Sequence, residues 1–312
     1  MSKDRIVNAG IRITRNCNMK CNYCNIQYNE KDELSLDEWK KAVDIIKDLG
    51  VQDIVLLGGE PTLYPHITEL VHYITKEKGM NCNLTTNAFK NRDKVVEILE
   101  AGLTNIGVSV DNLNIKDSIS PLKAKNGLDL IDYLISLNRN YSIVNYTVLN
   151  KKNVDSVLDL IKHMNSLGVA TYILPFHWGN EGTFEHRKNN EQFAFITDED
   201  LDKFNKTVDE IIKMKKEGYK INNAVEFFEA AKKHIKNLDW KCTGLSELRM
   251  DSDGKLVCCC DNVGKVNEKY TIFNIVENMG DFLETREGDC QRCKGCLWPS
   301  SFEAEVKKNK MQ

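Results

Sequence analysis

The stretch Gly10-Ile11-Arg12-Ile13-Thr14, followed by Arg15-Asn16-Cys17-Asn18-Met19-Lys20-Cys21-Asn22-Tyr23-Cys24, decides how the rest of the chain is interpreted. Its first five residues alternate apolar and polar side chains, which predicts a β-strand. Three cysteines then follow in a C-x3-C-x2-C pattern. Three thiolates can hold one iron–sulfur cube, although an all-cysteine cube takes four. One iron is therefore expected to keep an open position, which is typical of metal centres that activate a ligand.

A zinc knuckle is the alternative for this motif, because zinc sites also use closely spaced cysteines. The commonest zinc unit is a C-x2-C pair with a second pair far along the chain. A tight triple with an aromatic residue, Tyr23, before its third cysteine is rarer, and it favours the iron–sulfur interpretation.

Length and composition restrict the class of protein. The 312 residues, 41% hydrophobic and 29% charged, are typical of a soluble protein with a sizeable core, and no apolar run is long enough for a membrane span. The N-terminus has no apolar secretory segment, so we expect a cytoplasmic protein whose eleven cysteines bind metal rather than form disulfides. A net charge of −3, with basic and acidic residues interspersed, indicates neither a nucleic-acid nor a membrane partner.

Strand and helix patterns alternate regularly through the first 175 residues. Further strands are expected at 54–57, 82–85, 105–110, 142–149 and 170–175, and helices at 39–49, 67–78, 94–101, 128–137 and 154–167. The segment Ser35-Leu36-Asp37-Glu38 is expected to cap the first of these helices. Such alternation predicts parallel strands with right-handed crossovers. Six units are fewer than the eight of a closed barrel, so we expect an α/β fold with an open, partial (β/α)6 TIM-like barrel. The pattern alone also allows a flat doubly wound sheet.

The rest of the chain divides into three parts. Residues 176–196 are expected to form a long loop, and two helices are expected at 198–216 and 224–237. From Trp240 the composition changes to cysteine, glycine and turn residues. We therefore predict a barrel core over residues 1–197, connecting helices over 198–239 and a small cysteine-rich domain over 240–312.

The C-x3-C-x2-C motif and its aromatic residue resemble those of the radical S-adenosylmethionine (SAM) superfamily, whose core is a partial barrel. The resemblance implies that Cys17, Cys21 and Cys24 hold a [4Fe-4S] cluster whose open iron chelates the amino and carboxylate groups of SAM. An electron then cleaves the sulfonium, and the resulting 5′-deoxyadenosyl radical removes a hydrogen atom from a substrate. The resemblance also implies an external electron donor of the flavodoxin or ferredoxin type.

The polar residues at the expected strand ends agree with this resemblance, because barrel enzymes bind ligands at the carboxyl ends of their strands. Gly58-Gly59-Glu60-Pro61 matches the family's Gly-Gly-Glu motif, whose backbone contacts the SAM amino group. The cofactor-binding residues implied are Tyr23, Gly58, Gly59, Glu60, Pro61, Asn87, Ser109, Asp111 and Asn150. Asn87, Ser109, Asp111 and Asn150 have the alternative of being helix caps or turn formers. Residues 174–178 are placed to flank the adenine or the substrate, and His177 has packing as its alternative role.

A second cysteine set resembles the auxiliary-cluster domains, SPASM and twitch, of the same superfamily. Residues 248–250 and 255–257 are expected to form a hairpin around Gly254, and the hairpin would bring Cys242 and Cys259 together. The resemblance implies one auxiliary [4Fe-4S] cluster on Cys242, Cys259, Cys290 and Cys293, with a zinc site as the alternative. The ligand set stays open, because Cys258 and Cys260 flank Cys259 and Cys296 is spare.

The excess of cysteines over ligands suggests a hypothesis about catalysis. One of Cys258, Cys260 and Cys296 would return a hydrogen atom to a substrate radical and so give epimerisation, as in some family members. The alternative is that these thiols are buried bystanders.

The predicted activity is hydrogen-atom abstraction from a substrate carbon, and three substrate hypotheses follow. Maturation of a ribosomally made peptide by epimerisation, crosslinking or oxidation leads narrowly, although strand one begins within the first dozen residues and leaves no room for a leader-peptide-binding domain. A sugar or aminocyclitol dehydrogenase or epimerase is the second hypothesis. A non-catalytic iron–sulfur or zinc protein is the rival from another class.

Overall fold

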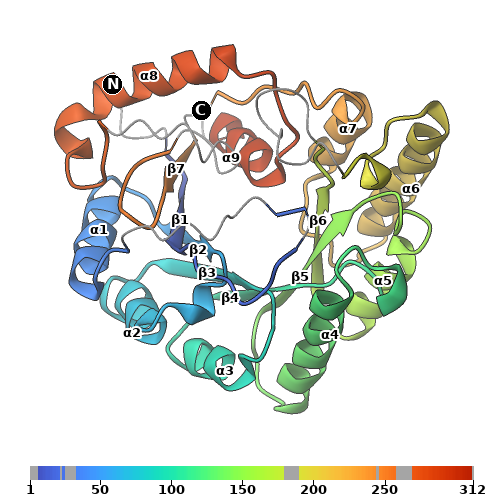
Figure 1. Ribbon diagram of the computed structural model, residues 1–312, viewed down its shortest axis with the longest axis horizontal. Coiled ribbons are helices and arrows are strands. Elements are labelled where there is room, and N and C mark those ends of the chain that lie inside the picture. Colours follow the sequence, from blue (N-terminus) through green and yellow to red (C-terminus); the bar gives the residue numbers. More distant parts are fainter. Residues whose placement is uncertain are drawn as a thin grey trace.

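A computed structural model describes residues 6–21, 23–24, 33–178, 190–243, 246–257 and 269–310 of the chain. Seven parallel strands form one sheet in the order β6-β5-β4-β3-β2-β1-β7. The strands are β1 (Asn8–Thr14), β2 (Asp53–Gly58), β3 (Asn81–Thr86), β4 (Asn105–Ser109), β5 (Ile143–Leu149), β6 (Ala170–Pro175) and β7 (Glu247–Met250). The sheet curves around a central space, and helices lie outside it (Figure 1). This is the open, partial barrel that the sequence predicts.

Each crossover between consecutive barrel strands carries a helix. These helices are α1 (Leu36–Asp48), α2 (Ile67–His72), α3 (Arg92–Glu100), α4 (Pro121–Ser136) and α5 (Val157–Ser166). α1 begins where the sequence predicts, because Ser35 and Glu38 form a capping box. α4 begins seven residues before the expected 128, since Pro121 occupies its first turn, where a missing N–H costs nothing. α2 continues into a π-helical turn, Tyr73–Glu77.

Four more helices follow the six strand–helix units. α6 (Asp198–Lys216) and α7 (Val225–His234) match the predicted helices, whereas α8 (Ile275–Arg292) and α9 (Pro299–Lys310) lie in the region expected to be rich in turns. In Figure 1, α8 lies beside β7, and α9 lies between β7 and α7. In the described part of the chain, no helix is both long enough and apolar enough to cross a membrane.

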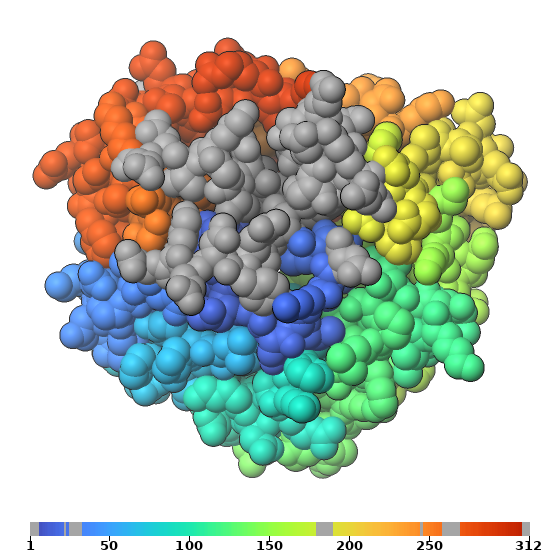
Figure 2. Space-filling view, viewed as in Figure 1, coloured from blue at the N-terminus to red at the C-terminus, as the bar shows by residue number. Residues whose placement is uncertain are grey.

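The C-terminal region shares the barrel's sheet and core. β7 pairs in parallel with β1, with Asn8 opposite Glu247 and Ile11 opposite Met250. The expected hairpin forms as well, because Met250 bridges Leu256 and Gly254 has a φ of +78°. The sequence missed the pairing with β1, since a four-residue strand next to a hairpin carries no signal for a distant partner. On the surface, blue residues from the first part of the chain lie next to orange residues from the C-terminal part (Figure 2).

Apolar side chains fill the layer between the sheet and its helices. One cluster joins outward-facing strand residues such as Ile11 and Ile54 to Trp39 of α1, and it extends to Tyr270 and Phe282 of the C-terminal region. A second cluster lies between β6, α6 and α7 and includes Cys296. The rigid layer fixes the loops at the carboxyl ends of the strands, where the candidate site lies.

Candidate functional site

The first cysteine loop follows β1 directly. Cys17 and Cys21 are half-buried and Cys24 is exposed, and a turn closes with the Cys24 N–H donating to the Cys21 carbonyl at 3.0 Å. Burial raises the pKa of the Cys17 thiol, and the charges of Glu60, Cys24 and Cys21 add to this effect. Within the described residues, no three acidic, histidine or cysteine side chains are close enough to share a single metal ion.

Two polar side chains from neighbouring loops point at these sulfurs. Asn87, directly after β3, has its Nδ2 atom 3.7 Å from the Cys17 Sγ atom. Ser120, the residue before α4, has its Oγ atom 3.6 Å from the Cys21 Sγ atom. The sequence placed Asn87 near SAM, but in the structure its amide faces a predicted cluster ligand. Ser120 carried no signal, because only the fold brings α4 to this loop.

The glycine pair after β2 is required by the cysteine loop itself. A Cβ atom on Gly59 would lie 2.2 Å from the Asn16 carbonyl oxygen, and one on Gly58 would lie 2.7 Å from the Thr14 carbonyl oxygen. The Gly59 N–H donates to the Thr14 carbonyl at 2.9 Å, and the Glu60 N–H donates to the Asn16 carbonyl at 2.8 Å. The pair therefore lets the β2 loop support the loop that carries Cys17.

Glu60 connects two loops through its side chain. Its carboxylate is fully buried and accepts hydrogen bonds from the Thr86 hydroxyl at 2.7 Å and the Asn87 N–H at 2.8 Å. The hydroxyl of Thr62 and the amide of Asn91 also donate to it, at 2.7 and 3.2 Å. Pro61 is buried at the start of a short 3-10 turn, Pro61–Leu63. Glu60 thus holds the β2 and β3 loops in a fixed relation.

Two of the remaining predicted cofactor residues make turns within the chain. Asp111 accepts hydrogen bonds from the Ser118 hydroxyl at 2.5 Å and the Ile119 N–H at 3.1 Å, while burial raises the pKa of its carboxyl. Asn150 is fully buried and accepts a hydrogen bond from the Lys152 N–H at 2.9 Å. These hydrogen bonds are typical of residues that form turns. Turn formation is the alternative to cofactor binding that the sequence allows for both residues. Ser109, at the end of β4, is half-buried.

Aromatic side chains join the cysteine loop to the opposite side of the barrel. The Tyr23 ring meets the Phe176 ring edge-on at 6.4 Å, and Phe176 meets Phe193 at 5.7 Å. Burial raises the pKa of Tyr23 to about 12. His177 is buried, with its ring 5.4 Å from that of Trp298. The loop after β6 therefore contacts both the first cysteine loop and the C-terminal cysteine region.

Lys123 is a residue that the sequence did not single out. It lies in the first turn of α4, and its ammonium group interacts with Tyr23, Cys21 and Cys24. Burial alone would lower the pKa of Lys123, but these neighbours outweigh it and hold the pKa above its ordinary value. A single lysine in a helix has no signature in sequence, whereas the fold brings its charge within electrostatic reach of the thiols.

One backbone bridge joins two segments of the second cysteine set. The Cys296 N–H donates to the Trp240 carbonyl at 2.9 Å, which aligns the segment before Cys242 with the turn after α8. Cys290 and Cys296 are each 7% exposed, and Cys242 and Cys293 are half-buried. Cys296 packs in the apolar cluster of α6 and α7. Cys258, Cys259 and Cys260 lie outside the described residues.

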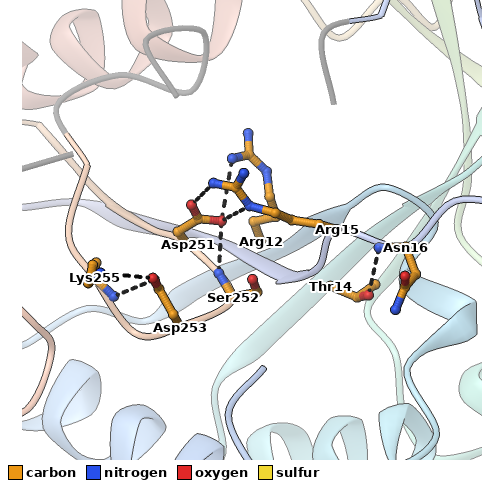
Figure 3. A network of polar contacts seen from close by, with 8 residues as sticks. All are labelled: Arg12, Thr14, Arg15, Asn16, Asp251, Ser252, Asp253 and Lys255. Carbon is orange, nitrogen blue, oxygen red and sulfur yellow. Dashed lines mark hydrogen bonds and ion pairs between the residues drawn. The ribbon is translucent and has the colours of Figure 1, made fainter. Parts of the chain in front are cut away.

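A polar network links β1 to the β7 hairpin (Figure 3). The Asp251 side chain is fully buried, and its carboxylate accepts hydrogen bonds from Arg15, with the Nε–Oδ1 distance being 3.0 Å. Arg12 lies 3.5 Å from the same carboxylate. Burial would raise the pKa of Asp251, but the two guanidinium groups hold it at about 2. Arg15 is two residues before Cys17, so this ion pair fixes the base of the cysteine loop.

A cavity of about 440 Å³ opens at the other end of the barrel. Its lining includes the early strand residues Asn8, Asn105 and Tyr172, together with Glu303 of α9. Conserved chemistry in this kind of fold belongs to the carboxyl ends of the strands. The cavity therefore lies apart from the candidate site.

Comparison with known proteins gives the class. Residues 11–164 match the Radical SAM superfamily. The GTP 3',8-cyclase of Aquifex aeolicus is 27% identical over 271 residues, which cover 80% of each chain. The Streptococcus suis SuiB structure bound to S-adenosylmethionine superposes with a TM-score of 0.70 at 16% identity, over 88% of this chain and 66% of SuiB. The anSMEcpe structure with bound AdoMet and Cp18Cys peptide has a TM-score of 0.58 at 13% identity, over 98% and 96% of the two chains.

Residues 11–164 are therefore a radical SAM domain, as the cysteine motif predicts. Enzymes of this superfamily use a [4Fe-4S] cluster together with S-adenosylmethionine. The described residues fit such a group, because Asn87 and Ser120 direct donors at two thiols and Lys123 adds a positive charge beside them. The chain spans about two thirds of SuiB's length, at 66%.

Proposed function

We propose that this protein is a radical SAM enzyme in which Cys17, Cys21 and Cys24 hold the catalytic cluster. The observation that carries the proposal is the convergence of three strand-end loops on these thiols. Gly58 and Gly59 let the β2 loop pack closely against the loop that carries Cys17, and the Asn87 Nδ2 atom lies 3.7 Å from the Cys17 sulfur. When bound, the cluster and SAM supply a 5′-deoxyadenosyl radical that removes a hydrogen atom from a substrate carbon.

The chain's own residues prepare this chemistry. Glu60 holds the loops after β2 and β3 together, so that the thiols keep their spacing. Lys123 brings a positive charge to a site that gains negative charge when thiolates form. The rings of Tyr23, Phe176 and Phe193 form an apolar wall beside the cysteine loop, which excludes water from a reactive radical.

We infer a second, auxiliary cluster on Cys242, Cys290 and Cys293, with Cys259 as the fourth ligand. The Trp240–Cys296 bridge pairs the segment before Cys242 with the segment that follows Cys293, and this pairing supports the proposed set. The division into a barrel over 1–197, connecting helices over 198–239 and a cluster domain over 240–312 stays part of this proposal. Because β7 and β1 share a sheet, we expect these parts to unfold together.

For the substrate, we propose a peptide segment or another molecule of low charge. Three of the cations described near the mouth of the barrel face a carboxylate: Arg12 and Arg15 face Asp251, and Lys151 lies 2.9 Å from Asp200. A fourth, Lys123, interacts with the thiols and with Tyr23. A triphosphate needs several cations that are not already compensated. The aromatic wall formed by Phe176 and Phe193 suits an apolar or peptide surface instead.

A nucleotide is the second candidate substrate, and similarity over most of the chain favours it. The Aquifex aeolicus relative, named GTP 3',8-cyclase, aligns over 80% of each chain. Either substrate needs an external one-electron donor. Peptide epimerisation with Cys258, Cys260 or Cys296 as the hydrogen-atom donor stays a prediction.

One anaerobic experiment tests the activity and the substrate class. The protein is reconstituted with iron and sulfide, reduced with dithionite and supplied with SAM, and 5′-deoxyadenosine is measured by chromatography. We expect about eight irons per chain, if both cubes form, and release of the nucleoside. Adding GTP, or a precursor peptide encoded beside the gene, in deuterated form identifies the substrate by transfer of deuterium into 5′-deoxyadenosine. A colourless protein that releases no nucleoside contradicts the proposal.

A further inference from the structure

Asn87 is held so that its amide N–H points at the sulfur of Cys17. Its backbone N–H donates to Glu60 at 2.8 Å, and its Oδ1 atom accepts a hydrogen bond from the Phe89 N–H at 2.8 Å. The second contact fixes which side-chain atom is oxygen, so the Nδ2 atom 3.7 Å from the Cys17 Sγ atom is the nitrogen. An amide nitrogen only donates. One N–H of this amide donates to the Asn18 Oδ1 atom at 2.9 Å, and the other is the donor for the Cys17 sulfur.

Ser120 makes the matching contact with Cys21. Its hydroxyl is 3.6 Å from the Cys21 Sγ atom. Ser120 occupies the N-cap position of α4, yet its side chain caps no N–H of that helix. A cysteine that ligates iron is a thiolate without a proton, so the hydroxyl must be the donor when metal is bound. The serine thus has a free donor directed at a ligand instead of at its own helix.

We propose that Asn87 and Ser120 raise the reduction potential of the cluster on Cys17, Cys21 and Cys24 by donating hydrogen bonds to two of its ligating sulfurs. The inference rests on the proposed function, because it needs that cluster. Reduction adds a negative charge that spreads onto the sulfurs, and a fixed donor stabilises the reduced state more than the oxidised one. Such outer contacts orient and tune metal ligands in other sites. The two donors therefore ease the entry of the electron that starts the reaction.

The two donors differ in how deeply they are buried and in the contacts that hold them. Asn87 is 8% exposed, and the Phe89 N–H holds its side-chain oxygen at 2.8 Å, so its amide is a fixed donor. Ser120 is half-buried, and its own N–H donates to Ser118 at 2.9 Å. We expect the larger effect on the reduction potential from Asn87. A dipole that is already oriented does not have to reorganise when the cluster gains an electron.

The test is an EPR-monitored redox titration of the reconstituted, full-length protein with and without SAM. Only the signal that changes when SAM is added belongs to the cluster with the open iron. Ser120→Ala removes a donor, Ser120→Thr keeps it, and Asn87→Asp keeps the acceptor for Phe89 while removing the donor. Ser156→Ala is the matched control, because Ser156 occupies the N-cap position of α5 and also makes no side-chain cap.

We expect Ser120→Ala and Asn87→Asp to lower the equilibrium constant for one-electron reduction by up to about tenfold, which is 59 mV. Ser120→Thr and Ser156→Ala are expected to keep the wild-type potential. Unchanged potentials in Ser120→Ala and Asn87→Asp, at full iron content, would overturn the inference while leaving the proposed function intact. If Asn87→Asp binds no iron, the Ser120 pair decides the question. A wild-type protein without iron defeats the proposed function itself.

Discussion

The two cysteine regions of this chain are built in opposite ways. The first lies on a loop at the carboxyl edge of the barrel, where Cys24 is exposed and polar side chains approach the other two thiols. The second lies around the end of α8, where Cys290 and Cys296 are each only 7% exposed. A backbone bridge between Trp240 and Cys296 closes it. Cys24 of the first region is accessible to a ligand, whereas Cys290 and Cys296 of the second are enclosed by the chain.

This difference in exposure distinguishes two possible roles of a metal centre, which the spacing of the cysteines alone does not distinguish. A centre that activates a ligand needs an open face and groups that tune its charge, whereas a centre that passes electrons or stabilises structure needs neither. The loop after β6 touches both regions, through Phe176 on Tyr23 and His177 on Trp298. The regions are therefore distinct in chemistry but adjacent in the fold.

The largest expected effect is the loss of SAM cleavage when the open region loses a ligand. Cys21→Ser should reduce release of 5′-deoxyadenosine by about 100-fold or more, since even outer partners of metal ligands cost 10–100-fold. Cys82→Ala is the control, because Cys82 is fully buried in the apolar core away from both regions. We expect near wild-type nucleoside release from it, measured by chromatography. Equal activity in the two variants would remove the first cysteine loop from the reaction.

The enclosed region should respond differently to the same kind of change. Cys290→Ala is expected to lose about four of eight irons, as one cube requires, while dithionite-driven release of 5′-deoxyadenosine persists. Cys296→Ala is the matched control and should keep all the iron, because Cys296 packs in the apolar cluster of α6 and α7. The measurement is iron content with the EPR spectrum of each variant. Loss of iron in Cys296→Ala would make Cys296 a ligand in place of one of the four assigned.

A smaller effect should follow from adding a methyl group at Gly59, which packs against the first cysteine loop. A Cβ atom on Gly59 would lie 2.2 Å from the Asn16 carbonyl oxygen, so Gly59→Ala must displace the cysteine loop. We expect reduced iron at that loop and a free energy of unfolding lower by about 1–3 kcal/mol, the usual cost of overpacking. Gly280→Ala, within α8, meets nothing within 4 Å and should raise stability by about 0.5–1 kcal/mol. Urea unfolding of both variants tests the contrast.

Sequence predicts this barrel well because each unit repeats a local pattern. The capping box at Ser35 and the apolar run at residues 54–57 have local causes, and both features are confirmed in α1 and β2. The sequence missed β7 as a barrel strand and missed α8 and α9 entirely. Their formation depends on partners far along the chain, and α8 and α9 have weaker amphipathic patterns than α1.

The site shows the same division between local and distant causes. The cysteine triple and the glycine pair are local motifs, and the sequence places both at strand ends. Lys123 and Ser120 were missed, because they reach the thiols only through the packing of α4. The carboxylate of Glu60 has a structural role that no motif predicts, since it joins loops of the chain. Asp251 has no motif either, and only the fold pairs it with Arg15.

The smallest effect concerns the link between the two regions, the ion pair of Asp251 with Arg15 and Arg12. The arginines hold the pKa of Asp251 at about 2, below its ordinary 3.8, against the effect of burial. A carboxyl whose pKa is depressed on folding adds stability above the unfolded pKa and loses it as pH falls towards the folded pKa. The contribution is about 2 kcal/mol at neutral pH and should disappear between pH 4 and pH 2.

Asp251→Asn measures this contribution directly. The variant should be less stable than the wild type by about 2 kcal/mol at pH 7, and the difference should shrink as pH falls through 4, because the wild-type carboxyl then becomes neutral as well. Urea unfolding at several pH values gives the two curves. Asp159→Asn, at a side chain that is 73% exposed, serves as the control and should follow the wild type. A difference that stays constant with pH would mean that packing, and not the charge of Asp251, joins the cysteine loop to the β7 hairpin.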